Sequence, residues 1–119
     1  MTPEDHIEAV LQHLAGGRVF PDVAPLNTER PFITYQAAGG APDNYLSGDR
    51  PEKQQVRMQV NCWVSQEQGR RAASELAILV EDAVRSAIHL QAEVITGRVA
   101  TYDEETNLRG TMQDFSMYC

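Results

Sequence analysis

The chain has 119 residues, of which 42% are hydrophobic, and its 17 acidic and 10 basic residues give a net charge of −7. This length allows one domain, residues 1–119, with a core that needs no disulfide or metal to hold it together. The acidic balance, with a single lysine at Lys53, argues against nucleic-acid binding as the main task, and no apolar run is long enough to span a membrane.

A short amino-terminal helix is predicted first. Pro3 suits its first turn, and a glycine pair at 16–17 ends it. Its buried stripe consists of Ile7, Val10, Leu11 and Leu14. Residues 18–20 are predicted as a short strand. The prolines of residues 21–31 then make an extended linker before a second strand at residues 32–37.

Residues 38–53 are the least regular stretch of the chain. This segment is too long for a tight hairpin, and loops of this length in small domains are usually functional or disordered. Its only apolar pair, Tyr45 and Leu46, is well placed to dock on another surface.

A strand followed by a long helix forms the unit around which the rest is organised. Residues 55–64 alternate strictly between apolar and polar or bulky side chains, which indicates a half-buried antiparallel strand. Ser65 can cap the helix that follows, and Gln68 completes a capping-box pattern. From Gln66 onward the period is helical. The apolar stripe of this helix consists of Leu76, Val80, Val84 and Ile88.

The last part of the chain contributes two more strands. Residues 92–102 are predicted as a strand, with Gly97 marking a bulge or a close approach. An acidic turn follows at 103–107, and residues 109–118 form the final strand. The element order is therefore helix, strand, strand, strand, helix, strand, strand. This order predicts an α+β fold in which a mostly antiparallel sheet of about five strands packs against two helices on one face.

The polar residues offer no recognisable catalytic or metal site. His6 and His13 lie about 10 Å apart along a helix, which is too far for two ligands of one zinc ion. His89 follows the long helix and is expected to cap its last carbonyls. Cys62 lies on the apolar face of its strand, so a buried thiol is expected, while a bridge to Cys119 stays open. We expect no cofactor, no metal and no catalysis.

The polar face of the central strand ends in the only tryptophan of the chain, Trp63. Two interpretations are open. Trp63 either packs under a neighbouring loop or belongs to an interface with a neighbouring subunit, because Trp and Arg are frequent at binding hot spots.

Three strings resemble a family of tailed-phage proteins. They are RVFPDVAP at residues 18–25, RPFITYQ at residues 30–36 and VRMQVNCW at residues 56–63, the last followed by a long Ala-rich helix. On these strings the chain resembles the tail completion or tail terminator proteins of phages and prophages, similar in fold to the lambda tail terminator. The resemblance covers nearly the whole chain, and it rests on the order and spacing of the strings together.

The resemblance implies a structural role without catalysis. Proteins of this family form rings, commonly hexameric, that stop tail-tube polymerisation and provide the surface to which the head attaches. The implied partners are further copies of the chain, the tail tube protein and the head–tail connector protein. The implied location is the virion tail, after assembly in the cytoplasm of the bacterial host. This agrees with an amino terminus that has no signal-peptide pattern.

Loops between strands are functional in such rings, so residues 38–53 are the candidate to contact the tail tube or the next subunit. The candidate interface residues are Asp22, Arg30, Asp43, Tyr45, Asp49, Arg50, Arg57 and Trp63. A closed ring joins two different patches of each subunit, here one mainly acidic and one carrying arginines. We also predict a bore that is neutral or negative overall, so that DNA passes through it without sequence-specific binding.

Two other classes of function stay open. A small dimeric α+β module that binds a ligand or has a regulatory role would show a deep apolar pocket on one face of the sheet. An enzyme would need a cleft that brings His89 or a histidine of the first helix close to Cys62 or to carboxylates.

Overall fold

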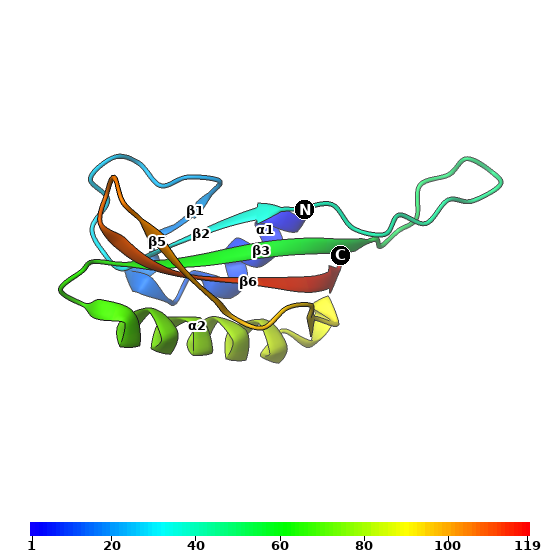
Figure 1. Cartoon of the computed structure of the whole chain (residues 1–119). Coiled ribbons are helices and arrows are strands. Elements are labelled where there is room, and N and C mark those ends of the chain that lie inside the picture. Colours follow the sequence, from blue (N-terminus) through cyan, green and yellow to red (C-terminus); the bar gives the residue numbers. More distant parts are fainter.

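A six-stranded sheet with two helices on one face makes up the fold in the computed structural model, which describes residues 1–119 (Figure 1). The elements in chain order are α1 (Pro3–Leu11), η1 (Ala15–Gly17), β1 (Val19–Pro21), β2 (Phe32–Ala37), β3 (Gln55–Val64), α2 (Gly69–Ser86), η2 (Ile88–Leu90), β4 (Glu93–Val94), β5 (Val99–Asp103) and β6 (Leu108–Tyr118), where η marks a short 3-10 helix. This arrangement confirms the predicted α+β fold and the order of its elements.

The sheet has the strand order β1-β2-β3-β6, and β4 and β5 both pair with the other edge of β6. β1 runs parallel to β2, and every other pair is antiparallel. The longest pairing joins β3 to β6, from Gln55 opposite Tyr118 to Val64 opposite Arg109. Pro21 has no N–H to donate to a neighbouring strand, but it lies at the end of the edge strand β1, so no hydrogen bond between central strands is lost.

The hydrophobic core lies between the sheet and the helices. The alternation predicted for β3 places Met58, Val60 and Cys62 on the side of the helices, where all three are buried. The other elements of the core contribute Ile7 and Leu11 from α1, Ile33 and Tyr35 from β2, Val80 and Val84 from α2, and Phe115 and Met117 from β6. Burial raises the pKa of the Cys62 thiol to about 12, which keeps it protonated and unreactive. Both cysteines are free, so there is no bridge to Cys119.

The stretch predicted as one strand over residues 92–102 is two strands, β4 and β5. Val94 pairs with Phe115 and Val99 pairs with Met112, so residues 95–98 lie opposite only two residues of β6. The extra residues, with Gly97 among them, interrupt the ladder in the way a bulge does. The sheet therefore has six strands where about five were expected.

The long helix begins later than its apolar periodicity predicted. Ser65 and Gln68 exchange both hydrogen bonds of the capping box, at 2.9 and 3.2 Å, yet α2 starts only at Gly69. Gly69 has a φ of +82°, a left-handed conformation that glycine adopts without strain. The capping pair thus closes a turn that precedes the helix.

The first helix is also shorter than predicted. It ends at Leu11, so His13 and Leu14 lie beyond it, although Leu14 is still buried. His6 on this helix lies beside His89, with ring centroids 5.8 Å apart. The expectation that His89 caps α2 is wrong, because η2 carries this residue past the last turn of the helix.

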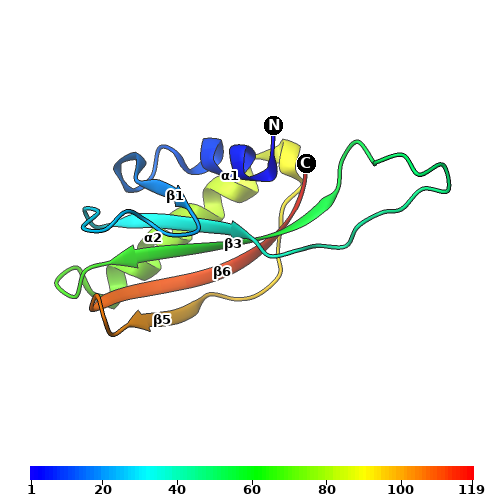
Figure 2. The ribbon, with the colours of Figure 1, turned by 90° about the horizontal axis from the view of Figure 1, so that it is seen from above.

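The link between β2 and β3 projects far from the body of the molecule (Figure 2). As predicted, residues 38–53 contain no helix or strand. We call residues 38–54 the arm. With it the molecule measures 54 × 26 × 23 Å.

Candidate functional site

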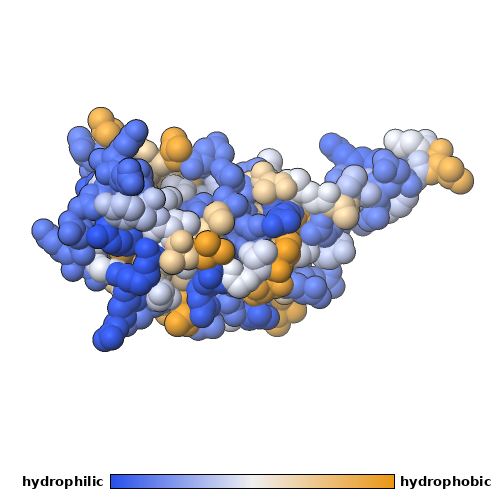
Figure 3. All heavy atoms as spheres, viewed as in Figure 1, coloured by the Kyte–Doolittle hydropathy of each residue, from blue (hydrophilic) through white to orange (hydrophobic).

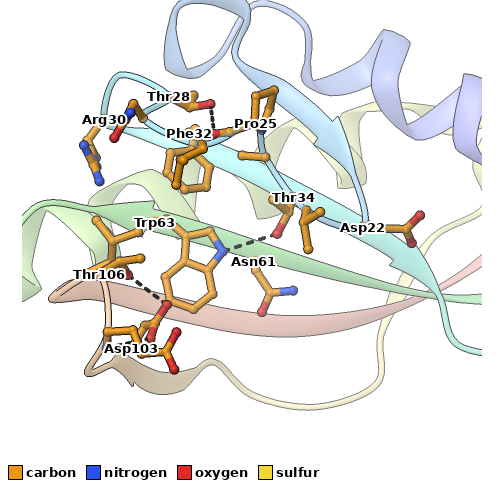
Figure 4. A pocket seen from close by; sticks show the side chains of 16 residues that line it. Asp22, Pro25, Thr28, Arg30, Phe32, Thr34, Asn61, Trp63, Asp103 and Thr106 are labelled. Atoms are coloured by element: carbon orange, nitrogen blue, oxygen red, sulfur yellow. Dashed lines mark hydrogen bonds between the residues drawn. The ribbon is translucent and has the colours of Figure 1, made fainter.

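A groove of about 530 Å³ lies on the face of the sheet that the helices leave open. Its floor is the start of β2 and the end of β3. One wall is the loop of residues 22–30, and the other is the turn that joins β5 to β6 (Figure 4). Phe32 and Trp63 are its aromatic residues, and Val23 and Leu26 stand on the loop wall. We call this feature the Trp63 groove.

Trp63 is held on the floor of the groove by two contacts. Its Nε1 donates a hydrogen bond of 3.2 Å to Oγ1 of Thr34 on β2. Gly110 stands opposite on β6, and a Cβ at that position would lie 2.7 Å from Cζ3 of the indole. The indole therefore lies against bare backbone on one side, while the residue as a whole is only half-buried and lines the groove. The interpretation that Trp63 packs under a neighbouring loop is therefore only partly correct.

Arg30 stands at the edge of the groove without a partner for its charge. The four ion pairs of the chain do not include it, and its Nε is buried without a hydrogen-bond acceptor. The carboxylate of Asp103 on the opposite wall is occupied, because it accepts from the Glu105 N–H at 3.1 Å and from Thr106 Oγ1 at 2.8 Å. The groove therefore combines an aromatic floor with an unpaired guanidinium, the group best suited to bind a carboxylate.

The arm is fixed to the body at its base. The Ala38 N–H donates to the Arg57 carbonyl at 2.7 Å, and the Arg57 N–H donates to the Gly39 carbonyl at 2.8 Å. On the returning side, Gln54 and Cys119 exchange two backbone hydrogen bonds of 3.2 Å. These bonds extend the pairing of the sheet and set the direction in which the arm leaves it.

Beyond this base the arm is free. The last tie on the outgoing side is the Ala41 N–H, which donates to Oε1 of Gln55 at 2.6 Å. Residues 42–53 make no hydrogen bond to the body of the chain. Tyr45 is more than half exposed and Leu46 is completely exposed. Figure 3 shows apolar atoms at the far end of an otherwise mostly polar arm, so the tip is an apolar surface with nothing to pack on in a single chain.

All but one of the predicted interface residues belong to one of two groups, the groove or the arm. The groove carries Asp22, Arg30 and Trp63. The arm carries Asp43, Tyr45, Asp49 and Arg50. The two groups lie at opposite ends of the molecule, since the arm leaves from one end of β3 and the groove lies at the other (Figures 1 and 4).

Arg57 is the exception, because it has a partner in its own chain. Its Nε and Nη2 lie 2.9 and 2.5 Å from Oδ2 of Asp114 on β6, and the Asp114 side chain is only 8% exposed. The ion pair joins β3 to β6 on the open face of the sheet. Asp114 lies within the strand predicted over residues 109–118, but the register that brings it to Arg57 depends on the fold.

Sequence reasoning also missed the walls of the groove. Val23 and Leu26 are apolar residues in a linker rich in proline. Their apolar character is the one feature of the sequence that could have indicated this wall. Nothing in the linker itself indicates that it stands over Trp63, because the two are brought together by the pairing of β2 with β3.

Comparison with known proteins concerns the chain as a whole. The family model described as tail completion protein gp17 matches residues 7–119, a range that includes both the groove and the arm. No curated protein shows a significant match to the chain. Neither helix combines the length and the apolar character that crossing a bilayer requires.

Proposed function

Because the chain belongs to the tail completion protein gp17 family, and is therefore a structural protein of a phage tail, we propose that it forms a ring at the end of the tail tube. This ring stops polymerisation of the tube and provides the surface to which the head is joined. Such work requires interfaces and no catalysis. The match over residues 7–119 carries the proposal, because it spans the whole sheet, α2 and the arm.

The placement of the candidate interface residues supports a ring. A subunit with two unlike surfaces at opposite ends makes head-to-tail contacts, and these close into a ring when the rotation between neighbours allows it. The Trp63 groove and the arm are two such surfaces. A symmetric dimer, in contrast, joins one patch to the same patch on its partner.

The proposed partners are further copies of the chain in a hexameric ring, the tail tube protein and the head–tail connector protein. The 119 residues act as one domain, and assembly takes place in the cytoplasm of the bacterial host. The net charge of −7 supports a bore that repels DNA, so that the genome passes through it without binding.

Deleting the gene from its phage tests this function. We expect electron micrographs of the lysate to show filled heads without tails, together with free tail tubes of irregular length. Supplying the wild-type chain in trans restores joined particles. Normal, joined particles in the absence of the gene would contradict the proposal.

The size of the groove favours one other candidate, a ligand-binding module. A volume of about 530 Å³ is within the range of small-molecule sites. Native mass spectrometry of the purified protein tests this alternative, which predicts a bound compound of constant mass and a dimer at every concentration.

A further inference from the structure

We propose that the tip of the arm, Tyr45 and Leu46, docks into the Trp63 groove of the next subunit. The inference rests on the proposed self-assembly and identifies the two surfaces that make the contact. Three observations support it: the reach of the arm, the chemistry of its tip and the unpaired charge of Arg30.

The arm does not reach the groove of its own chain. Leu46 is five residues beyond Ala41, the last residue tied to the body, so it extends at most about 17 Å from that point. Ala41 is bonded to Gln55 at the start of β3, and Trp63 is eight residues further along this strand, about 26 Å away. The arm also points away from the body (Figures 1 and 2). An arm that enters the groove therefore belongs to a second copy.

The tip matches the groove in chemistry. Tyr45 and Leu46 are exposed apolar side chains, and neither belongs to the hydrophobic core of its own chain. The groove offers the ring of Trp63 on its floor, and Leu26 on its loop wall is 90% exposed. Tyrosine and tryptophan are enriched among the residues that contribute most to binding near the centre of an interface.

Charge fixes the orientation of this contact. The Nε of Arg30 is buried and has no acceptor in the single chain. Asp43 stands two residues before Tyr45 on the arm and forms no ion pair in the chain. When the tip of the arm enters the groove, Asp43 of one copy supplies the carboxylate that Arg30 of the next copy lacks.

The first experiment uses two variants with one defective surface each. The arm variant carries Tyr45→Ala and Leu46→Ala, and the groove variant carries Leu26→Asp. All three substituted side chains are exposed in the single chain, so the fold is retained. Sedimentation velocity is expected to show that either variant needs at least tenfold higher protein concentration than wild type to assemble.

Mixing the two variants gives the sharper result. The intact arm of the groove variant fits the intact groove of the arm variant, so the mixture is expected to form dimers and nothing larger. A matched control changes Ile78 and Leu79, an adjacent pair of partly exposed apolar residues on α2, to alanine. This control is expected to assemble like wild type.

Charge reversal tests the orientation. Arg30→Asp or Asp43→Arg alone is expected to weaken assembly at least tenfold. The two changes together in one chain restore it, because the pair then forms with its signs exchanged.

Two contrary results are distinguishable. If wild type assembles and the arm variant assembles equally well, the arm does not fill the groove, while the proposed ring stands. If the wild-type protein stays monomeric at every concentration, both alone and when mixed with tail tubes from the gene-deleted phage, the proposed self-assembly is wrong.

Discussion

Gly110 shows how a single position without a side chain shapes the groove. It faces Trp63 across the β3–β6 pair, and the ring occupies the space where a Cβ would be. Thr101 Oγ1 on β5 approaches the same space. The position of Trp63 on the floor of the groove therefore requires glycine at residue 110, although glycine inside a strand is by itself unfavourable.

Replacing Gly110 with alanine is expected to destabilise the fold by about 1 to 3 kcal/mol, because the new methyl group overpacks against Trp63. Urea unfolding followed by tryptophan fluorescence measures the loss. Gly97→Ala is the matched control, since a Cβ there meets no atom within 4 Å. Equal stability of the two variants would contradict the close contact.

The ion pair between Arg57 and Asp114 gives the second prediction at this scale. Arg57→Met leaves the nearly buried Asp114 carboxylate without its partner, so we expect a loss of about 2 to 4 kcal/mol in the free energy of unfolding. Asp114→Asn is expected to lose less, because the Arg57 side chain is 41% exposed and water can solvate its charge. Chemical denaturation of both variants measures the difference. The opposite order would show that Arg57 is not the main support of this carboxylate.

Among the elements, the arm is independent of the fold that carries it. Its hydrogen bonds to the body end at Ala41 on one side and Gln54 on the other. Tyr45 and Leu46 contribute nothing to the hydrophobic core. An element with so few contacts adds little to stability, and it is the kind of segment that opens or moves first.

Replacing residues 42–53 with a short glycine-containing turn is expected to leave the melting temperature within a few degrees of wild type, since little native contact is lost. The same variant is expected to fail to assemble, because the tip is gone. Calorimetry and sedimentation on one preparation test both halves. A large drop in melting temperature would show that the arm packs on the body after all.

Elements with a clear period could be predicted from the sequence, whereas the points at which strands pair or break could not. The alternation of residues 55–64 and the apolar stripe of α2 gave the main strand, the helix and the face of the core. The division of residues 92–102 into β4 and β5 depends on how many residues of β6 lie opposite, and that is a property of the pairing. The candidate interface residues could be chosen from the sequence, but their separation into a groove group and an arm group required the fold.

For the whole molecule, shape and charge act together. The arm and the groove lie at opposite ends of an elongated subunit that measures 54 Å along its longest axis. In the proposed ring, such a subunit would join its neighbours in one direction, and the net charge of −7 on each chain keeps unassembled copies apart at low salt. Assembly is therefore expected to become easier as salt screens this repulsion.

The solution mass of the purified protein tests the central claim most directly. Light scattering is carried out over a range of protein and salt concentrations, alone and with added tail tubes. The ring predicts a species of six times the 13.2 kDa chain mass, or a monomer that grows into it. A mass of two chains at every concentration would contradict the ring and favour the ligand-binding module.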